Sequence, residues 1–149
     1  MMTRRAVPRV VPLFNRVLKP LVAAGMPMGP NGLLTVRGRT SGELRSTPLA
    51  IIEADGRRWV WSPWGDVHWV RNLRVAGTAT ITVRRTEHEV CAVELDPAER
   101  VRFFRETFGP VARRIPFGVR FVRLLDSVDV DDPVAAAEGR VVFELYPVT

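Results

Sequence analysis

The sequence predicts a mainly β protein with flanking helices, an α+β fold in which about six antiparallel strands close into a small barrel. Two observations predict it. Short apolar runs are joined by tight-turn signals such as Asp55-Gly56, which favours a hairpin between antiparallel neighbours. Helical patterns are inserted among these runs and do not alternate with them, which argues against a doubly wound parallel sheet. Closure into a barrel also removes the exposed edges of short strands.

The chain is long enough for one core and too short for two ordinary domains, since it has 149 residues of which 46% are hydrophobic. We divide it into an N-terminal amphipathic segment, residues 1–30, and a single barrel domain, residues 31–149. Apolar residues in the N-terminal segment recur at helical spacing beside basic ones. Two interpretations stay open: a helix packed on the domain or on a second copy, and peripheral membrane contact through residues 1–28.

The first half of the barrel domain contains three predicted strands and a short helix. The strands are predicted around the apolar runs 33–36, 49–52 and 59–61. Asp66 is a candidate N-cap for the helix, and Gly77 stands where a left-handed C-terminal cap is needed.

Three further strands and a second helix are predicted in the other half. Residues 78–84 alternate strictly between apolar residues and threonine, which is typical of a half-exposed strand. A hairpin at residues 84–87 leads into a strand over residues 88–95, and residues 140–147 form a closing strand. The helix between them begins with Asp96 as N-cap, Pro97 at the first helical position and Glu99 completing a capping box. Gly109 is its expected stop, and residues 110–133 are expected to be partly helical and irregular.

Charge points to an anionic partner. The net charge is +6, from 22 Lys and Arg against 16 Asp and Glu. A phosphorylated cofactor, nucleic acid and a lipid surface all fit that charge. Cys91 is the only cysteine, so no internal disulfide is possible, and we expect it to be a buried small hydrophobe. No Cys or His spacing offers a metal site, and a cytoplasmic location fits, with membrane association as the alternative.

A basic, hydroxyl-rich turn follows the first strand. Two glycines allow tight curvature and leave amide groups accessible, while arginine and hydroxyl side chains can donate to phosphate oxygens. The residues of this turn and its continuation are Gly38, Arg39, Thr40, Ser41, Gly42, Arg45, Ser46 and Thr47. A solvated hairpin loop without a ligand is the alternative.

A second motif, SPWGDVHWVRNL over residues 62–73, follows the third strand and opens a helix. The free amide groups of a first helical turn favour an anion or a carbonyl-like acceptor. Pro63 and Gly65 fix a bend whose backbone can approach a flat ring. Trp61 and Trp69 are expected in the core, and Trp64 is the tryptophan expected to be exposed for stacking.

These motifs resemble a known family. The succession GRTSGELRSTP, a DG hairpin and SPWGDVHWVRNLR is similar to the deazaflavin-dependent nitroreductases, which are split β-barrel proteins that use coenzyme F420. The resemblance covers residues 33–94. It implies a split barrel that binds F420 through residues 31–149, with FMN as the alternative cofactor. The implied cofactor-binding residues are Arg39, Thr40, Ser41, Gly42, Arg45, Ser46, Pro48, Ser62, Pro63, Trp64, Gly65, Trp69 and Asn72.

The resemblance further implies a reductase that transfers a hydride from reduced deazaflavin to a small organic acceptor, namely a quinone, enone or nitro compound. The cofactor carries this chemistry, and the protein binds, orients and excludes water. A side chain must still supply a proton or stabilise the developing anion. The candidates are Ser62, His68 and Tyr146.

Two other functions remain as alternatives. One is a split barrel that binds FMN or another cofactor without turnover. The other is a small basic nucleic-acid-binding module, but arginines are spread along the chain and no nucleic-acid motif is present, so no nucleic acid is expected. A monomer and a homodimer both fit the sequence.

Overall fold

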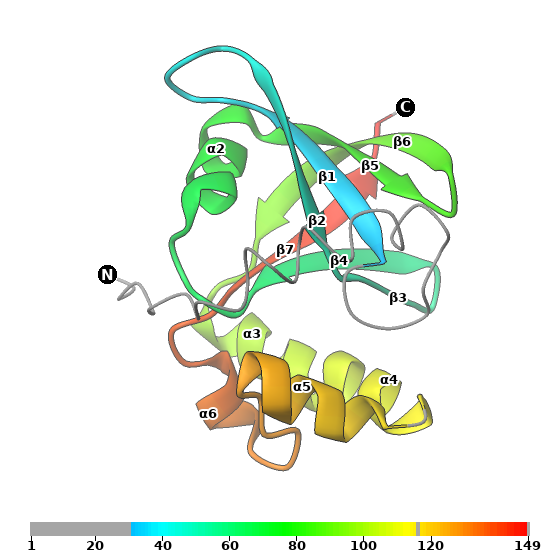
Figure 1. Cartoon of the computed structure of the whole chain (residues 1–149). Coiled ribbons are helices and arrows are strands. Elements are labelled where there is room, and N and C mark those ends of the chain that lie inside the picture. The colour runs from blue at the N-terminus through cyan, green and yellow to red at the C-terminus, as the bar shows by residue number, and fades with distance from the viewer. Residues whose placement is uncertain (1–30, 116, 149) are drawn as a thin grey trace.

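The computed structural model describes residues 31–115 and 117–148, which form one curled antiparallel sheet with helices packed on it (Figure 1). The strands of this part of the chain are β1 (Gly32–Arg37), β2 (Leu44–Leu49), β3 (Ile51–Ala54), β4 (Arg57–Ser62), β5 (Thr78–Val83), β6 (Thr86–Glu94) and β7 (Val141–Pro147). Their order in the sheet is β2-β1-β5-β6-β7-β4-β3, and every pair is antiparallel. The prediction of a mainly β fold, with antiparallel strands in a barrel-like sheet and flanking helices, is confirmed.

The sheet has seven strands, not about six, because the chain bends at Ala50. The apolar run that predicted one strand supplies the end of β2, which pairs with β1, and all of β3, which pairs with β4. Only Ala50 separates these two edge strands, so the opposite edges of the sheet lie next to each other. Asn31 supports the bend: it accepts a hydrogen bond from the Ile51 amide (2.7 Å) and donates one to the Ile51 carbonyl (3.1 Å).

Strand β4 faces two cores at once. Its alternation places Val60 in the barrel interior with residues such as Leu34 and Phe143. Trp59 and Trp61 point to the opposite face and pack against the helices. The run RRWVWS is therefore buried on both sides, which explains why its central residues are all apolar.

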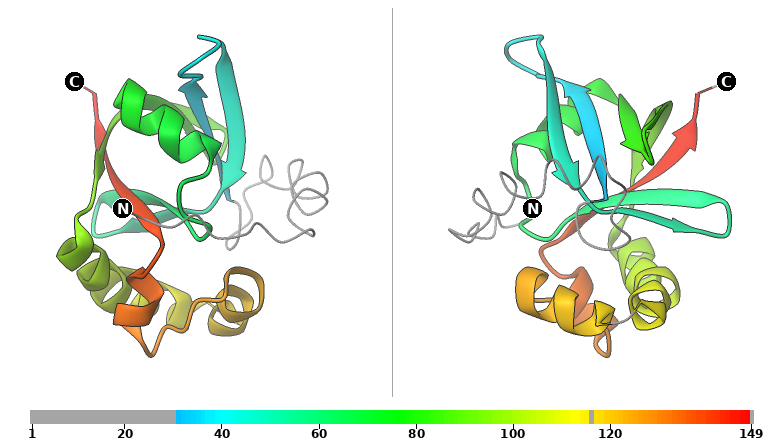
Figure 2. Two further views of the ribbon diagram at one scale, coloured as in Figure 1. Left: turned by 90° about the vertical axis from the view of Figure 1, so that its left-hand side faces the viewer. Right: turned by 45° about the vertical axis from the view of Figure 1, so that its right-hand side comes forward.

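The described helices are α2 (His68–Ala76), α3 (Pro97–Phe103), a π-helix η1 (Phe104–Phe108), α4 (Gly109–Arg114), α5 (Gly118–Asp126) and α6 (Pro133–Ala137). Helix α2 lies against the barrel, and the others gather at one side of it (Figure 2). Phe103, Phe104 and Phe108 join the tryptophans in the second core, with Trp61 and Phe108 ring centroids 4.8 Å apart. The prediction that these phenylalanines are core residues is confirmed.

The helix that begins at Pro97 starts as predicted and ends differently. Asp96 and Glu99 form the capping box, with the Glu99 amide donating to Asp96 at 2.8 Å. The predicted stop at Gly109 is wrong, because the backbone there stays helical (φ −57°) and continues into α4. Pro110 has no amide hydrogen and would clash with the carbonyl four residues earlier in an α-helix. The wider π turn before it lets the helix pass this proline.

Cys91 is exposed, contrary to the prediction that it is buried. Along β6 the side chains alternate, and the register turns Val90 toward the barrel interior, so Cys91 faces out. The β5–β6 hairpin is confirmed: Arg84 and Arg85 form its two-residue turn with φ of 49° and 66°.

The N-terminal amphipathic segment, residues 1–30, and its predicted lipid contact lie outside the described residues. Among the residues that are described, no helix is long and apolar enough to cross a membrane.

Acid should remove the stabilisation contributed by Glu144. This carboxylate is buried (6% exposed side chain) and accepts two hydrogen bonds from Arg57, at 2.6 and 2.7 Å. The Arg57 hydrogen bond, opposed in part by burial, lowers the pKa of Glu144 below its ordinary value of 4.5. A lowered folded-state pKa means that the stabilisation is present above pH 4.5 and is lost as pH falls through the folded pKa.

We therefore expect Glu144→Gln to be less stable than the natural chain by about 1 kcal/mol at neutral pH, because Arg57 is largely exposed and solvent screens the pair. The difference should shrink below pH 4.5. Urea unfolding at neutral pH and below pH 4.5 measures this difference in stability, and Glu89→Gln at an exposed position is the control. A difference that grows toward acid pH would contradict this assignment.

Candidate functional site

The loop between β1 and β2, residues 38–43, is a tight turn shaped by its own backbone. The Gly38 amide donates to the Glu43 carbonyl (2.7 Å), and the Gly42 amide donates to the Gly38 carbonyl (2.9 Å). Gly42 has a left-handed backbone (φ 73°), which favours glycine. Arg37 donates to the Gly42 carbonyl from the side. The exposed residues between the two glycines, including Thr40 and Ser41, are presented on a rigid support.

Arg39 fastens this loop to α2. Its backbone amide and its Nη1 both donate to Asn72 Oδ1, at 3.1 and 2.7 Å. Its guanidinium also reaches the start of α2: Nη1 donates to the His68 carbonyl (3.5 Å), and Nη2 lies 3.4 Å from His68 Nδ1. Asn72 is only 4% exposed, so its polar side chain is buried for this contact. The two sequence motifs therefore meet in space.

Helix α2 presents one face to the loop. His68 and Asn72 are four positions apart and so lie on the same side of the helix. The N-cap residue is Val67, which offers no side-chain cap. The first amide groups of α2 therefore lack a capping partner beside the Arg39 guanidinium, and this is the arrangement that favours an anion or a carbonyl oxygen.

The β4–α2 connection is equally compact. Ser62 is fully buried, and its hydroxyl donates to the Gly65 carbonyl at 2.8 Å. The same carbonyl accepts from the Val67 amide at 2.9 Å. Gly65 has φ 78°, which only glycine adopts without strain, and this explains the glycine of the motif. Pro63 and Trp64 are partly exposed on the loop, so Trp64 is available for contact with a ligand on one side.

Asp66 is not the N-cap of α2, contrary to the prediction. The helix begins one residue later than that cap requires, and the Asp66 carboxylate pairs with Arg74 at 2.8 Å. Arg74 also donates two hydrogen bonds to Glu94 of β6, at 2.7 and 2.8 Å. Arg74 thus ties the loop before α2, the helix itself and the barrel together. The Glu94 hydrogen bonds, opposed in part by burial, raise the pKa of Arg74 further, so it stays charged.

Trp69 and the remaining predicted residues have supporting positions. Trp69 is partly buried and packs on Phe143, with ring centroids 6.3 Å apart. Ser46 lies in β2 with its hydroxyl 2.7 Å from the Thr35 hydroxyl. Pro48 also lies in β2, opposite Leu33. These positions place Ser46 and Pro48 along the strand that leaves the loop, and Trp69 on the side of α2 that packs against the barrel core.

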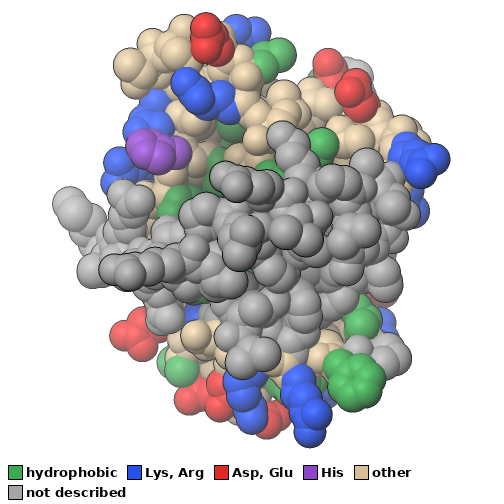
Figure 3. Space-filling view, viewed as in Figure 1, with side chains coloured by type: hydrophobic (Ala, Val, Ile, Leu, Met, Phe, Trp, Pro, Cys, Tyr) green, Lys and Arg blue, Asp and Glu red, His purple; other side chains and the backbone are tan. Residues whose placement is uncertain are grey.

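The loop and α2 carry more arginines than those singled out as candidates from the sequence. Arg45 is exposed in β2, and none of the ion pairs among the described residues involves it. Arg37 and Arg71 were missed as candidates, although Arg37 directly precedes Gly38 and Arg71 lies three positions after His68. Arginine side chains lie above and below a histidine on this face of the molecule (Figure 3). This concentration of positive charge fits an anionic ligand.

Tyr146 is not brought together with the other two catalytic candidates. Ser62 pairs with Val141 at one end of β7, and Tyr146 lies five residues further along that strand. At about 3.3 Å per residue, the separation is about 17 Å. Tyr146 instead neighbours Glu144, and partial burial, followed by the hydrogen bond with Glu144, raises the pKa of Tyr146. His68 and Ser62 lie at the two ends of the short β4–α2 loop.

The site fits a ligand with a negatively charged portion and a flat portion. Arginine side chains and uncapped helix amides stand at the β1–β2 loop, and Trp64 with the Gly65 bend stands at the β4–α2 loop. The chain at Gly38 is also close to its neighbours: a Cβ there would lie 2.7 Å from Ser41 Oγ. A phosphorylated cofactor with an aromatic ring has both portions.

Comparison with known proteins agrees with this chemistry. The family model described as F420H(2)-dependent quinone reductase matches residues 9–114. No curated protein sequence matches the chain.

Solved structures share the fold. An F420-H2 dependent reductase (FDR-A) is 19% identical, with a TM-score of 0.51, over 77% of this chain and 92% of that one. A conserved hypothetical protein from Mycobacterium tuberculosis is 15% identical, with a TM-score of 0.51, over 88% of this chain and 81% of that one. At these identities the likeness concerns the fold alone.

Proposed function

The chain belongs to the F420H(2)-dependent quinone reductase family and is an F420-dependent reductase, and we propose that its β1–β2 loop and the first turn of α2 together hold the anionic part of F420. The observation that carries the proposal is the contact of Arg39 with Asn72 and His68. This contact holds the basic β1–β2 loop against the uncapped N-terminus of α2. The arginines of the loop and the amide groups of the helix therefore direct positive potential at the same point on the surface.

Within this site the arginines have different tasks. Arg39 uses its donors on Asn72 and His68, so it positions the loop and adds charge. Arg45 pairs with no carboxylate in the part of the chain that the structure describes, so its guanidinium can fork onto phosphate or carboxylate oxygens of the cofactor. Thr40 and Ser41 add hydroxyl donors on the exposed rim of the loop.

The deazaflavin ring is assigned to the β4–α2 loop. Gly65 leaves room for close approach of the backbone, and Trp64 offers an aromatic face beside it. The buried Ser62 hydroxyl donates to the Gly65 carbonyl, so Ser62 shapes the loop that would carry the ring. Arg74 holds the same loop from outside through Asp66.

Reduced F420, when bound, supplies a hydride from its own ring carbon. The protein must then place an acceptor over the ring and deliver a proton to the oxygen that becomes negative. His68 is the residue positioned for this. Its Nδ1 faces the Arg39 guanidinium, which can only donate, so Nδ1 is the acceptor and the proton of the neutral ring is on Nε2. The Nε2–H group of this exposed side chain is free to donate.

A quinone is the acceptor class that this arrangement suits. Its reduction places negative charge on a carbonyl oxygen, and an N–H donor stabilises that charge. Enones and nitro compounds develop similar charge, but an enone has only one carbonyl oxygen and a nitro group carries both oxygens on one nitrogen, whereas a quinone has a second carbonyl oxygen on its ring.

The test is steady-state oxidation of reduced F420 by the purified chain with matched quinone, enone and nitroaromatic acceptors. We expect the quinones to give the highest kcat/KM, by about tenfold or more. Reduced FMN in place of reduced F420 is the control and should support no comparable rate. Equal rates with all acceptors would contradict the quinone assignment, and a faster reaction with FMN would contradict the cofactor site.

A further inference from the structure

A second feature of the surface is not used by the cofactor site. The turn between α4 and α5 carries a cavity of about 410 Å³, and we call its lining the α4–α5 corner. Its residues are Arg113, Arg114, Ile115, Phe117, Gly118, Val119 and Arg120. In Figure 1 this corner lies at the far end of the helical layer from the β4–α2 loop, so it is separate from the cofactor site.

Phe117 is exposed without a folding reason. It is 78% exposed, the highest value among the large apolar side chains described as exposed. Its backbone is also left-handed, with φ 62° and ψ 8°, a conformation that bulky residues avoid. Glycine or asparagine would suit this turn better, and neither would expose an aromatic ring to water. An exposed aromatic in a strained turn indicates a binding function.

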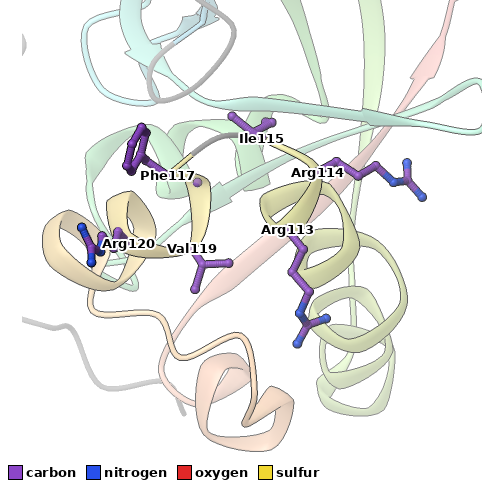
Figure 4. Close-up of a pocket in the computed structure, with 7 residues that line it drawn as sticks. Arg113, Arg114, Ile115, Phe117, Val119 and Arg120 are labelled. Carbon is purple, nitrogen blue, oxygen red and sulfur yellow. The ribbon is translucent and has the colours of Figure 1, made fainter.

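The surroundings of Phe117 are basic. Figure 4 shows Phe117 and Ile115 between Arg114 on one side and Arg120 on the other. Both arginines are exposed, and neither takes part in an ion pair among the described residues. Arg113 is also exposed but pairs with Asp131 at 3.0 Å. Among the described residues, those that line the cavity include no acidic one.

We propose that the α4–α5 corner is a docking surface for anionic phospholipid membranes, with Phe117 inserted at the interface and Arg114 and Arg120 on lipid phosphates. The charge of the corner is complementary to such a surface, and an aromatic ring flanked by basic side chains suits the boundary between headgroups and acyl chains. An acidic soluble partner would use the arginines but would give the ring no apolar medium. The proposal does not depend on the cofactor assignment.

The test is co-sedimentation of the full chain with phosphatidylcholine vesicles and with vesicles that also contain phosphatidylglycerol. Binding is expected only to the anionic vesicles and should fall with added salt. Phe117→Asn and the pair Arg114→Gln with Arg120→Gln should each weaken it by about tenfold or more. Asparagine tolerates the left-handed backbone, so Phe117→Asn should fold normally.

The matched control is the pair Arg102→Gln with Arg105→Gln, which removes the same charge from exposed positions elsewhere in the helical layer. It should change binding by less than about twofold. Equal losses in both pairs, unchanged binding of Phe117→Asn, equal binding to neutral vesicles, or no binding at all would each overturn the proposal. Unchanged binding of Phe117→Asn would assign lipid contact to another segment.

Discussion

Replacing Arg39 and Arg45 together by alanine is expected to weaken F420 binding about a hundredfold, at about 1.4 kcal/mol for each arginine. Arg45→Ala removes a charge-assisted contact, and Arg39→Ala removes a positive charge and the side-chain bond that holds the loop on Asn72. The anionic portion of the cofactor is assigned to the β1–β2 loop, which bears Arg39, and to the start of β2, which bears Arg45. Quenching of tryptophan fluorescence during F420 titration measures the loss, since Trp64 lies in the neighbouring loop.

The single variants separate the two roles. Arg45→Ala should lose about tenfold in affinity with no change in thermal stability, because its side chain is exposed and makes no ion pair among the described residues. Arg39→Ala should lose affinity and also stability, since the Arg39 side chain bonds the buried Asn72. Arg105→Ala, an equal charge change in η1, is the control. If Arg105→Ala weakened binding as much as Arg45→Ala, the loss would come from long-range electrostatic attraction and not from a contact at this site.

His68→Gln is expected to lower kcat for quinone reduction by about a hundredfold, the usual range for removal of a positioned proton donor. The affinity for F420 should stay within about threefold, because the glutamine side chain can still accept from Arg39. Stopped-flow measurement of the oxidation of bound reduced F420 would isolate this step from binding.

His88→Gln is a matched control for His68→Gln. His88 is the only other histidine in the chain and lies in β6, opposite Ile81, away from α2. It should leave kcat unchanged. A normal kcat for His68→Gln would remove the proton-donor role, and an equal loss in both variants would point to a general effect on folding.

Much of the fold could be predicted because its signals are local. Alternation predicted β5, a hairpin was predicted directly after it, and the residues from Asp96 to Glu99 predicted their own helix start. The bend at Ala50 could not be predicted, since leucine, alanine and isoleucine read as one continuous strand. What divides them is the pairing of β2 with β1 and of β3 with β4, which is a property of the whole curled sheet.

In the site, too, features that depend on local sequence could be predicted, and features that depend on contacts between distant residues could not. The glycines, arginines and tryptophan of both motifs could be recognised from the chain. That Arg39 would bond Asn72, 33 positions away, could not. Asp66 had the residue type of an N-cap, but the Arg74 guanidinium, which Glu94 also holds, offered its carboxylate a stronger partner than the helix amides. Tyr146 was separated from Ser62 by strand register, which residue types do not reveal.

The most direct test of the proposed F420 site is to titrate the purified chain with F420 and, in parallel, with FMN, and to monitor tryptophan fluorescence. We expect saturable quenching by F420 with a Kd on the order of micromolar. FMN should bind more weakly by about tenfold or more, because its anionic portion is shorter than that of F420. Equal or tighter binding of FMN, or no binding of F420, would contradict the assignment of the β1–β2 loop and α2 to this cofactor.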